Sequence, residues 1–165
     1  MKPGLYCFDM DGTLISGYLG NPDKDYHKWE VLPGRIEKLI AIRDAGGTAA
    51  IVTNQGGVAF GYNTQDDFTK KIQSVLGALS VEGKCLIRHV SFCFAHPDGN
   101  PPYSDPHDVA RRKPSGEMIN EAINATPLEM LGYICMVGDR TEDEGAAKAA
   151  GVEFFWEKDF FGGGN

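Results

Sequence analysis

The apolar run at residues 5–8 leads directly into Asp9 and Asp11, two aspartates separated by one residue, and then into Gly12 and Thr13. A short, uniformly apolar run is typical of a strand buried on both faces of a parallel sheet. In open α/β sheets, ligands bind at the carboxyl ends of such strands. Two carboxylates this close are unfavourable as anions unless a cation or a shared proton compensates them. The run therefore predicts a parallel sheet with an acidic binding site at its edge.

The rest of the chain repeats this alternation, and the alternation predicts the fold class. Strand-like apolar runs occur at residues 49–52, 90–94, 133–137 and 152–156, and helix-like segments separate them. Repeated β–α alternation gives a parallel sheet with helices on both faces. We therefore expect an α/β protein, a Rossmann-like three-layer αβα sandwich with a mostly parallel sheet.

Length and composition limit the organisation further. The 165 residues predict a single domain over residues 1–161, with a polar flap at about 14–32 and a glycine-rich tail at 162–165. No apolar run approaches the roughly 18–20 residues that span a bilayer. The chain also reaches Asp9 before a signal-peptide core could form, so we expect a cytoplasmic protein with no membrane partner. The net charge of −7 argues against broad electrostatic binding of nucleic acid, but it leaves room for a small basic pocket.

Polar residues gather where the predicted strands end, and one basic run opens a predicted helix. The clusters are Asp9 with Asp11, Thr53 with Asn54, the run Arg111-Arg112-Lys113, and Asp139 with Asp143. A parallel sheet brings such clusters to one edge. Together they provide a nucleophile, a proton donor, donors and a cation for phosphate oxygens, and acids for Mg²⁺, which are the groups that phosphoryl transfer requires.

This ordered set resembles the motifs of the haloacid dehalogenase superfamily of aspartate-nucleophile phosphatases, over nearly the whole chain. The resemblance implies that Asp9 attacks phosphorus and becomes an aspartyl-phosphate. Asp11 would protonate the leaving oxygen and then deprotonate the attacking water. The residues expected to bind substrate phosphate are Thr53, Asn54, Arg112 and Lys113.

The same resemblance implies a Mg²⁺ site formed by Asp9, the backbone carbonyl of Asp11, and Asp139. Thr13 is expected to support these groups through hydrogen bonds rather than to contact the substrate. Asp143 is expected either to support the metal site in the same way or to act as a negative charge at a helix N-terminus. Many relatives carry a cap domain between the motifs. Here the intervals at residues 14–52 and 54–112 are largely used by sheet-layer elements, so we expect no cap domain and an open site.

Local motifs narrow the likeness to two branches of the superfamily. The segment at residues 53–58, together with Arg112-Lys113-Pro114, resembles heptose-bisphosphate and histidinol-phosphate phosphatases, and also polynucleotide 3′-phosphatases. A small phosphorylated metabolite such as a sugar (bis)phosphate is the favoured substrate, and a nucleic-acid 3′ end is the alternative. A phosphotransferase or a non-catalytic phosphate-binding protein is a weaker alternative.

The sugar- and histidinol-phosphatase relatives usually carry a zinc loop, and this chain departs from it. Cys93 remains, but Ala95, Val109 and Arg111 stand where three other zinc ligands would be. We therefore expect Mg²⁺ and no zinc. Whether Cys93, His96 and His107 hold any metal is left open, as are the natural substrate, the oligomeric state and the presence of a partner over the site.

Overall fold

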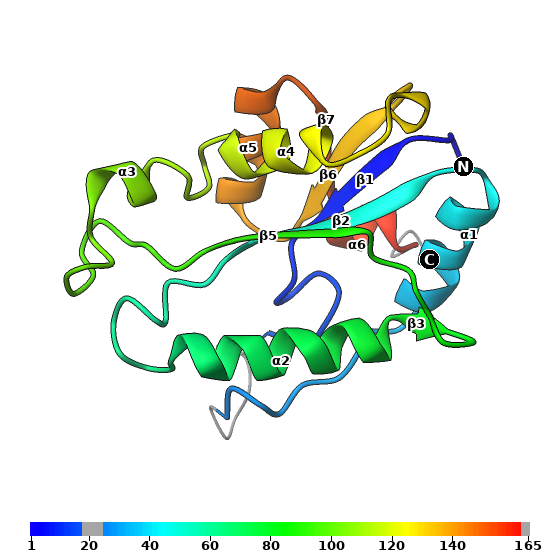
Figure 1. Cartoon of the computed structure of the whole chain (residues 1–165). Helices are drawn as coiled ribbons and strands as arrows, with labels where there is room; N and C mark the ends of the chain where they lie inside the picture. Colours follow the sequence, from blue (N-terminus) through cyan, green and yellow to red (C-terminus); the bar gives the residue numbers. More distant parts are fainter. Residues whose placement is uncertain (18–24, 163–165) are drawn as a thin grey trace.

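The computed structural model describes residues 1–17 and 25–162, which build a five-stranded parallel sheet (Figure 1). The strand order is β5-β2-β1-β6-β7, and every pair of neighbours is parallel. The strands are β1 (Leu5–Phe8), β2 (Thr48–Asn54), β5 (His89–Cys93), β6 (Ile134–Gly138) and β7 (Glu153–Trp156). Because β1 lies in the middle, Asp9 emerges from the centre of the sheet edge.

Helices cover both faces of the sheet, which confirms the predicted three-layer α/β class (Figure 1). One face packs against α1 (Arg35–Asp44), α2 (Gln65–Ala78) and α6 (Glu157–Phe160). The other packs against α4 (Glu117–Asn124) and α5 (Thr141–Ala150).

Smaller elements complete the described part of the chain. The short strands β3 (Ser80–Val81) and β4 (Lys84–Cys85) form an antiparallel pair. The helix α3 (Pro106–Val109) lies between β5 and α4. None of the described helices is long and apolar enough to cross a membrane.

Thr64, followed three residues later by Asp67, predicts the start of a helix, and α2 begins there. The Thr64 hydroxyl accepts from the Asp67 backbone N–H at 3.1 Å, and the Asp67 carboxylate accepts from the Thr64 N–H at 2.8 Å, which is a complete capping box. The helix buries Phe68 and Val75 against the sheet. Lys71 lies on the same buried face with 1% of its surface exposed, so the apolar face of α2 contains a lysine.

The sequence Thr126-Pro127-Leu128-Glu129 has the pattern of a capping box at the start of a short helix, and this predicted capping box is wrong. The Thr126 hydroxyl donates to the Ala122 carbonyl of α4 at 2.7 Å, and no side chain caps the following segment, which is a single 3₁₀ turn at Leu128–Met130. The hydroxyl thus binds back to the preceding helix, a competing bond that serine and threonine readily make.

The segment expected to be a flap, residues 14–32, is anchored at both ends. Leu14 and Ile15 are fully buried, and Ile15 bridges to Asp11 on one side and to Val31 on the other. The beginning of this segment is therefore part of the core. Residues 18–24 of the predicted flap and 163–165 of the predicted tail lie outside the described residues.

Arg35, at the start of α1, connects three parts of the chain. Its Nε donates to the Thr13 carbonyl at 2.7 Å, and its guanidinium also donates to the Glu157 carboxylate of α6. The same guanidinium lies 4.0 Å from the centre of the Phe161 ring. The loop after β1 is thereby held against α1 and α6.

Candidate active site

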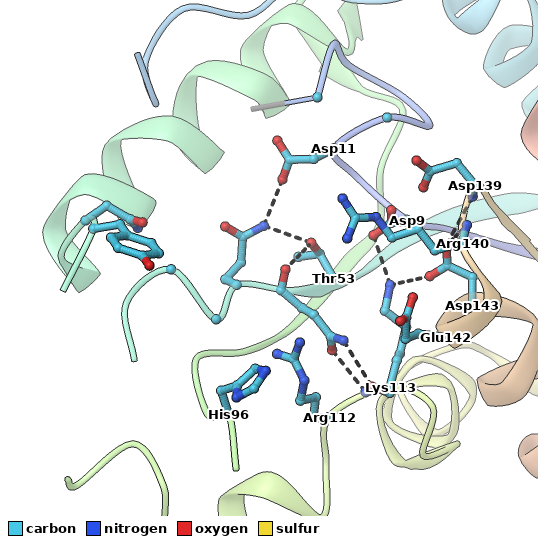
Figure 2. Close-up of a pocket in the computed structure, with 18 of the residues that line it drawn as sticks. Asp9, Asp11, Thr53, His96, Arg112, Lys113, Asp139, Arg140, Glu142 and Asp143 are labelled. Carbon is cyan, nitrogen blue, oxygen red and sulfur yellow. Dashed lines mark hydrogen bonds and ion pairs between the residues drawn. The ribbon is translucent and has the colours of Figure 1, made fainter. Parts of the chain in front are cut away.

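A pocket of about 520 Å³ lies at the carboxyl edge of the sheet, where the predicted polar clusters meet (Figure 2). The predicted residues that line it are Asp9, Asp11, Thr53, Asn54, Arg112, Lys113, Asp139 and Asp143. Thr13 is fully buried and is absent from the lining. The parallel sheet therefore brings residues from distant parts of the sequence to one site.

Lys113 occupies the centre of this site. Its Nζ donates to Asp9 Oδ1 at 2.9 Å and to Asp143 Oδ1 at 2.6 Å (Figure 2). It also donates to the Val52 carbonyl at 2.8 Å. Lys113 is 2% exposed, so all three contacts are shielded from water. Three acceptors satisfy the three ammonium hydrogens, which is the condition for burying such a charge.

Burial and the neighbouring charges act in opposite directions on the pKa values of Asp9 and Lys113. Burial raises the pKa of Asp9 to about 8, against the opposing effect of the Lys113 ammonium. Burial acts to lower the pKa of Lys113, but the carboxylates of Asp9 and Asp143 outweigh it and raise that pKa. Asp139 also acts to raise the pKa of Asp9. The Lys113 ammonium bonds to two carboxyl groups, those of Asp9 and Asp143, and Asp139 lies close to both, so a bound cation would favour the charged form of Asp9.

A carboxylate cluster suited to a metal ion is formed by Asp9, Asp139 and Asp143. One oxygen from each lies within 4.8 Å of the others. Carboxylate oxygens are the ligands that Mg²⁺ prefers. Thr13 Oγ1 donates to Asp139 Oδ1 at 3.4 Å, so the buried Thr13 side chain contacts one of the three aspartates of the cluster. The Asp11 side chain lies outside this cluster, and its predicted ligand role concerns its backbone carbonyl.

Asp143 has both carboxylate oxygens engaged. Oδ1 accepts from Lys113, and Oδ2 accepts the backbone N–H groups of Asp139 and Arg140, each at 3.1 Å. Gly138 makes room for this arrangement, because a Cβ there would lie 2.3 Å from Asp143 Oδ2. Asp143 therefore holds Lys113 and the turn after β6 together through hydrogen bonds.

Gly12 is required for a similar steric reason. Its φ is +83°, and a Cβ there would lie 2.3 Å from Asp139 Oδ2. Only glycine adopts this backbone conformation without strain, and only glycine lets the loop after β1 approach Asp139 so closely.

Thr53 and Asn54 are neighbours at the end of β2, but their side chains bind different partners. The Asn54 side chain accepts from the Lys113 N–H at 3.0 Å and donates to the Lys113 carbonyl at 3.1 Å. Asn54 thereby holds the backbone of Lys113 from both sides, a role that sequence reasoning missed. The Thr53 hydroxyl accepts from Gln55 Nε2 at 2.9 Å and lies in the pocket wall. Contact of Thr53 and Asn54 with phosphate stays a prediction.

Asp11 is held by two side chains that sequence reasoning did not assign to the site. Its Oδ1 accepts from Lys71 Nζ at 2.9 Å, and its Oδ2 accepts from Gln55 Nε2 at 3.0 Å. The Tyr26 hydroxyl donates to Gln55 Oε1 at 3.0 Å, and the Tyr26 ring lies 4.1 Å from the Lys71 ammonium. Burial raises the pKa of Tyr26, which keeps its hydroxyl a hydrogen-bond donor. A lysine within the apolar face of α2 was the sequence signal that could have revealed Lys71.

The basic run at residues 111–113 does not act as a unit. Arg111 pairs with Glu121 through contacts of 2.8 and 2.9 Å and is not part of the pocket lining. Arg112 lines the pocket and donates to the Ala95 carbonyl at 3.2 Å. Arg140 also lines the pocket, so the cations available there come from two separate loops.

Aromatic rings line another side of the pocket. Phe60 stacks on Tyr62 with ring centres 5.7 Å apart, and His96 lies 4.8 Å from Phe60. Tyr62 is 71% exposed, an unusual state for a large aromatic side chain. We call Phe60, Tyr62 and His96 the aromatic wall.

The three residues considered for another metal site have different contacts. Cys93 Sγ donates to the Asp108 carbonyl at 3.4 Å, and His96 Nδ1 accepts from the Asp98 N–H at 3.0 Å. Within residues 1–17 and 25–162, the aspartate cluster described above is the group of side chains close enough to share a metal ion. This group does not include Cys93, His96 or His107.

Comparison with known proteins agrees with this geometry. A putative HAD-like phosphatase from Mesorhizobium loti superposes with a TM-score of 0.74 and is 29% identical, covering 92% of this chain and 69% of its own. D,D-heptose 1,7-bisphosphate phosphatase from B. bronchiseptica, complexed with magnesium and phosphate, superposes with a TM-score of 0.72 and is 25% identical, covering 92% and 78%. The fold and the site define a phosphatase of the haloacid dehalogenase class, and the resemblance predicted from the motifs is confirmed.

A match to a family model narrows this class. The model described as polynucleotide kinase 3 phosphatase covers residues 4–160, and the chain belongs to this family. Among curated relatives, a D-glycero-α-D-manno-heptose-1,7-bisphosphate 7-phosphatase of Burkholderia mallei is 32% identical over 92% of this chain and 78% of its own length. The corresponding β-heptose enzyme of Rhodopseudomonas palustris is 32% identical over 93% and 82%.

Proposed function

We propose that this chain hydrolyses phosphomonoesters with Mg²⁺ through an aspartyl-phosphate on Asp9, and that its substrate is a small phosphorylated metabolite such as a sugar (bis)phosphate. The observation that carries this proposal is the position of Asp9. Asp9 directly follows the central strand β1 and lines the pocket, 2.9 Å from the Lys113 ammonium and next to two further carboxylates.

The residues present suit a bound Mg²⁺. Asp9, Asp139 and the backbone carbonyl of Asp11 would hold the ion, with Thr13 and Asp143 supporting the ligands. When bound, the ion would offset the repulsion between the Asp9 carboxylate and the phosphate.

The remaining steps belong to the side chains. An Asp9 oxygen attacks phosphorus, and Lys113, Thr53 and Arg112 bind the phosphoryl oxygens. Asp11 gives a proton to the leaving oxygen and later takes one from the water that releases phosphate. The aromatic wall would pack against the leaving group, since an aromatic face complements the apolar face of a sugar ring.

A polynucleotide 3′-phosphatase is the second candidate, and two observations favour it. The family model that matches carries that description, and the exposed Tyr62 ring could stack on a base. One observation argues against this candidate. Arg111 is paired with Glu121 outside the pocket, so the pocket residues do not form a continuous basic strip that could bind a nucleic-acid backbone. A phosphotransferase or a non-catalytic binder has no specific support.

We also propose that residues 1–161 form one domain without a cap, and that the protein is cytoplasmic. Limited proteolysis tests the first of these proposals, and cell fractionation tests the second.

The proposed activity is tested by phosphate release with Mg²⁺ from heptose 1,7-bisphosphate and from an oligonucleotide 3′-phosphate, with Asp9→Asn as the blank. A hundredfold preference in kcat/KM, about 2.7 kcal/mol, would decide between the two substrate classes. No turnover on either substrate, or on other phosphomonoesters, would refute the phosphatase proposal.

A further inference from the structure

The buried ammonium of Lys71 is a feature that the proposed chemistry has not used. Lys71 projects from the sheet-facing side of α2, where its neighbours along the helix are Phe68 and Val75. Only 1% of its side chain is exposed. A lysine in such a position normally extends its charge into water, and this one instead reaches Asp11.

Stability alone does not account for this lysine. Burying an ammonium is unfavourable, and an apolar residue of similar volume often serves a protein core better than a buried ion pair. Its partner Asp11 keeps 25% of its side chain exposed, so water could solvate that carboxylate if the lysine were absent. A buried ion pair such as Lys71 with Asp11 can be retained at a functional site even though it lowers the stability of the protein.

Asp11 without partners would have no fixed orientation. It sits in the loop after β1, and its side chain can rotate about two bonds. Lys71 from α2 binds one oxygen at 2.9 Å, and Gln55 from the loop after β2 binds the other at 3.0 Å. Tyr26 in turn restrains both, through its hydroxyl on Gln55 and its ring beside Lys71. Two separate elements therefore fix the carboxylate of Asp11 relative to Asp9.

We propose that Lys71 is a positioning residue that fixes the Asp11 carboxylate for both proton transfers of the reaction. This inference rests on the proposed function. In the first step an Asp9 oxygen bonds to phosphorus, the bond from phosphorus to the leaving oxygen breaks, and that oxygen takes the proton of Asp11. In the second step a water oxygen bonds to phosphorus, its proton goes to Asp11, and the bond from phosphorus to Asp9 breaks. Lys71 transfers no proton and holds Asp11 in place throughout.

The test compares two leaving groups in single-turnover experiments with excess enzyme and Mg²⁺. One substrate is whichever of heptose 1,7-bisphosphate and the oligonucleotide 3′-phosphate the wild type hydrolyses, since both release an alcohol that needs a proton. The other is p-nitrophenyl phosphate, whose leaving group departs without one. For Lys71→Met we expect alcohol release to slow about 100-fold and p-nitrophenol release to change less than about threefold. Lys70→Met, on the exposed side of the same helix, is the matched control.

The same variants separate positioning from a structural role. Lys71→Met should unfold at the same temperature as the wild type or a higher one, because a buried charge has been removed. In the Asp11→Asn background, Lys71→Met should slow alcohol release no further. Equal slowing of both substrates, or an undiminished effect of Lys71→Met in the Asp11→Asn background, would overturn the inference.

A further variant covers the case in which Lys71→Met does not fold. Tyr26→Phe keeps the ring beside Lys71 and removes only the hydroxyl that restrains Gln55, so alcohol release should slow selectively by a smaller factor. An unchanged ratio between the two substrates would contradict the inference. If the wild type releases no phosphate from any substrate, the proposed function fails instead, and the two failures are thereby distinguished.

Discussion

Lys113 Nζ lies 2.9 Å from Asp9 Oδ1, although the two residues are 104 positions apart in the chain. The Val52 carbonyl and Asp143 complete the shell of acceptors around this ammonium. The residue after β1, a backbone carbonyl of β2 and the first turn of α5 thus converge on one cation. Asp9, the nucleophile expected from the sequence, is therefore bound by a lysine that Val52 and Asp143 also hold.

Asp9→Asn tests the covalent mechanism. An amide is a poor nucleophile, so turnover should fall by about 10⁴-fold or more. The fold should persist, because Lys113 keeps Val52 and Asp143 as acceptors. Phosphate release and thermal unfolding would be measured beside Asp44→Asn, an exposed control in α1. Turnover near the wild-type rate would exclude Asp9 as the nucleophile.

Asp139→Ala tests the carboxylate cluster. Removing one of its acids should raise the Mg²⁺ concentration for half-maximal activity about 10-fold or more. A magnesium titration of phosphate release measures this directly. Glu144→Ala removes an exposed acid from α5 and should leave the requirement unchanged. If the two variants behave alike, Asp139 is not a ligand.

Asp143→Ala tests the support beneath the site. The substitution takes one partner from the buried Lys113 and leaves the N–H groups of Asp139 and Arg140 without their acceptor. We expect the free energy of unfolding to fall by about 3 kcal/mol, as urea denaturation would measure. A loss below about 1 kcal/mol would mean that the network relaxes around the gap.

Gly12→Ala and Gly61→Ala form a matched pair. Both glycines have positive φ, +83° and +76°, so both variants strain the backbone. Only at Gly12 would the new methyl group meet Asp139, since nothing lies within 4 Å of a Cβ at Gly61. A rise in the Mg²⁺ requirement is expected for Gly12→Ala alone. Equal effects of the two substitutions would show that the close approach to Asp139 is unimportant.

Metal removal tests the choice of ion. Excess EDTA should stop phosphate release, and added Mg²⁺ should restore it, because carboxylate oxygens bind this ion reversibly. Elemental analysis of the purified protein should find less than one zinc per chain. One zinc per chain would contradict this expectation. It would require Cys93 and His96 to give up the hydrogen bonds that they make in the structure, or other residues to bind the zinc.

The sequence predicted the sheet well because its strands have the strongest local signal. Short apolar runs ending in polar residues need no tertiary information, and the box of Thr64 and Asp67 depends only on residues three apart. The box predicted at Thr126 failed for a reason that is also local. A hydroxyl can bond back to the preceding helix as readily as forward, and the sequence does not say which bond wins.

The positions of the site residues followed from the strand ends, but their support did not. The Asn54 contact with Lys113 spans 59 residues, and the Lys71 contact with Asp11 spans 60. Such pairs depend on which face of α2 meets the sheet and on how the loops pass one another. A lysine in an apolar stripe is ordinarily interpreted as a side chain that reaches water. Only tertiary packing reveals that this one is enclosed.

Arg35 ties the loop after β1 to α6, and this has a consequence for how the protein can be handled. Residues 157–161 act as a brace on the loop that follows the nucleophile, although they contribute no group to the pocket. If they were removed, a nearly buried guanidinium would lose both its carboxylate and its aromatic neighbour while still bound to the Thr13 carbonyl. Trimming or fusing the chain close to α6 would therefore disturb the loop that carries Asp11 and Thr13, and with it the proposed active site, from the opposite end of the sequence.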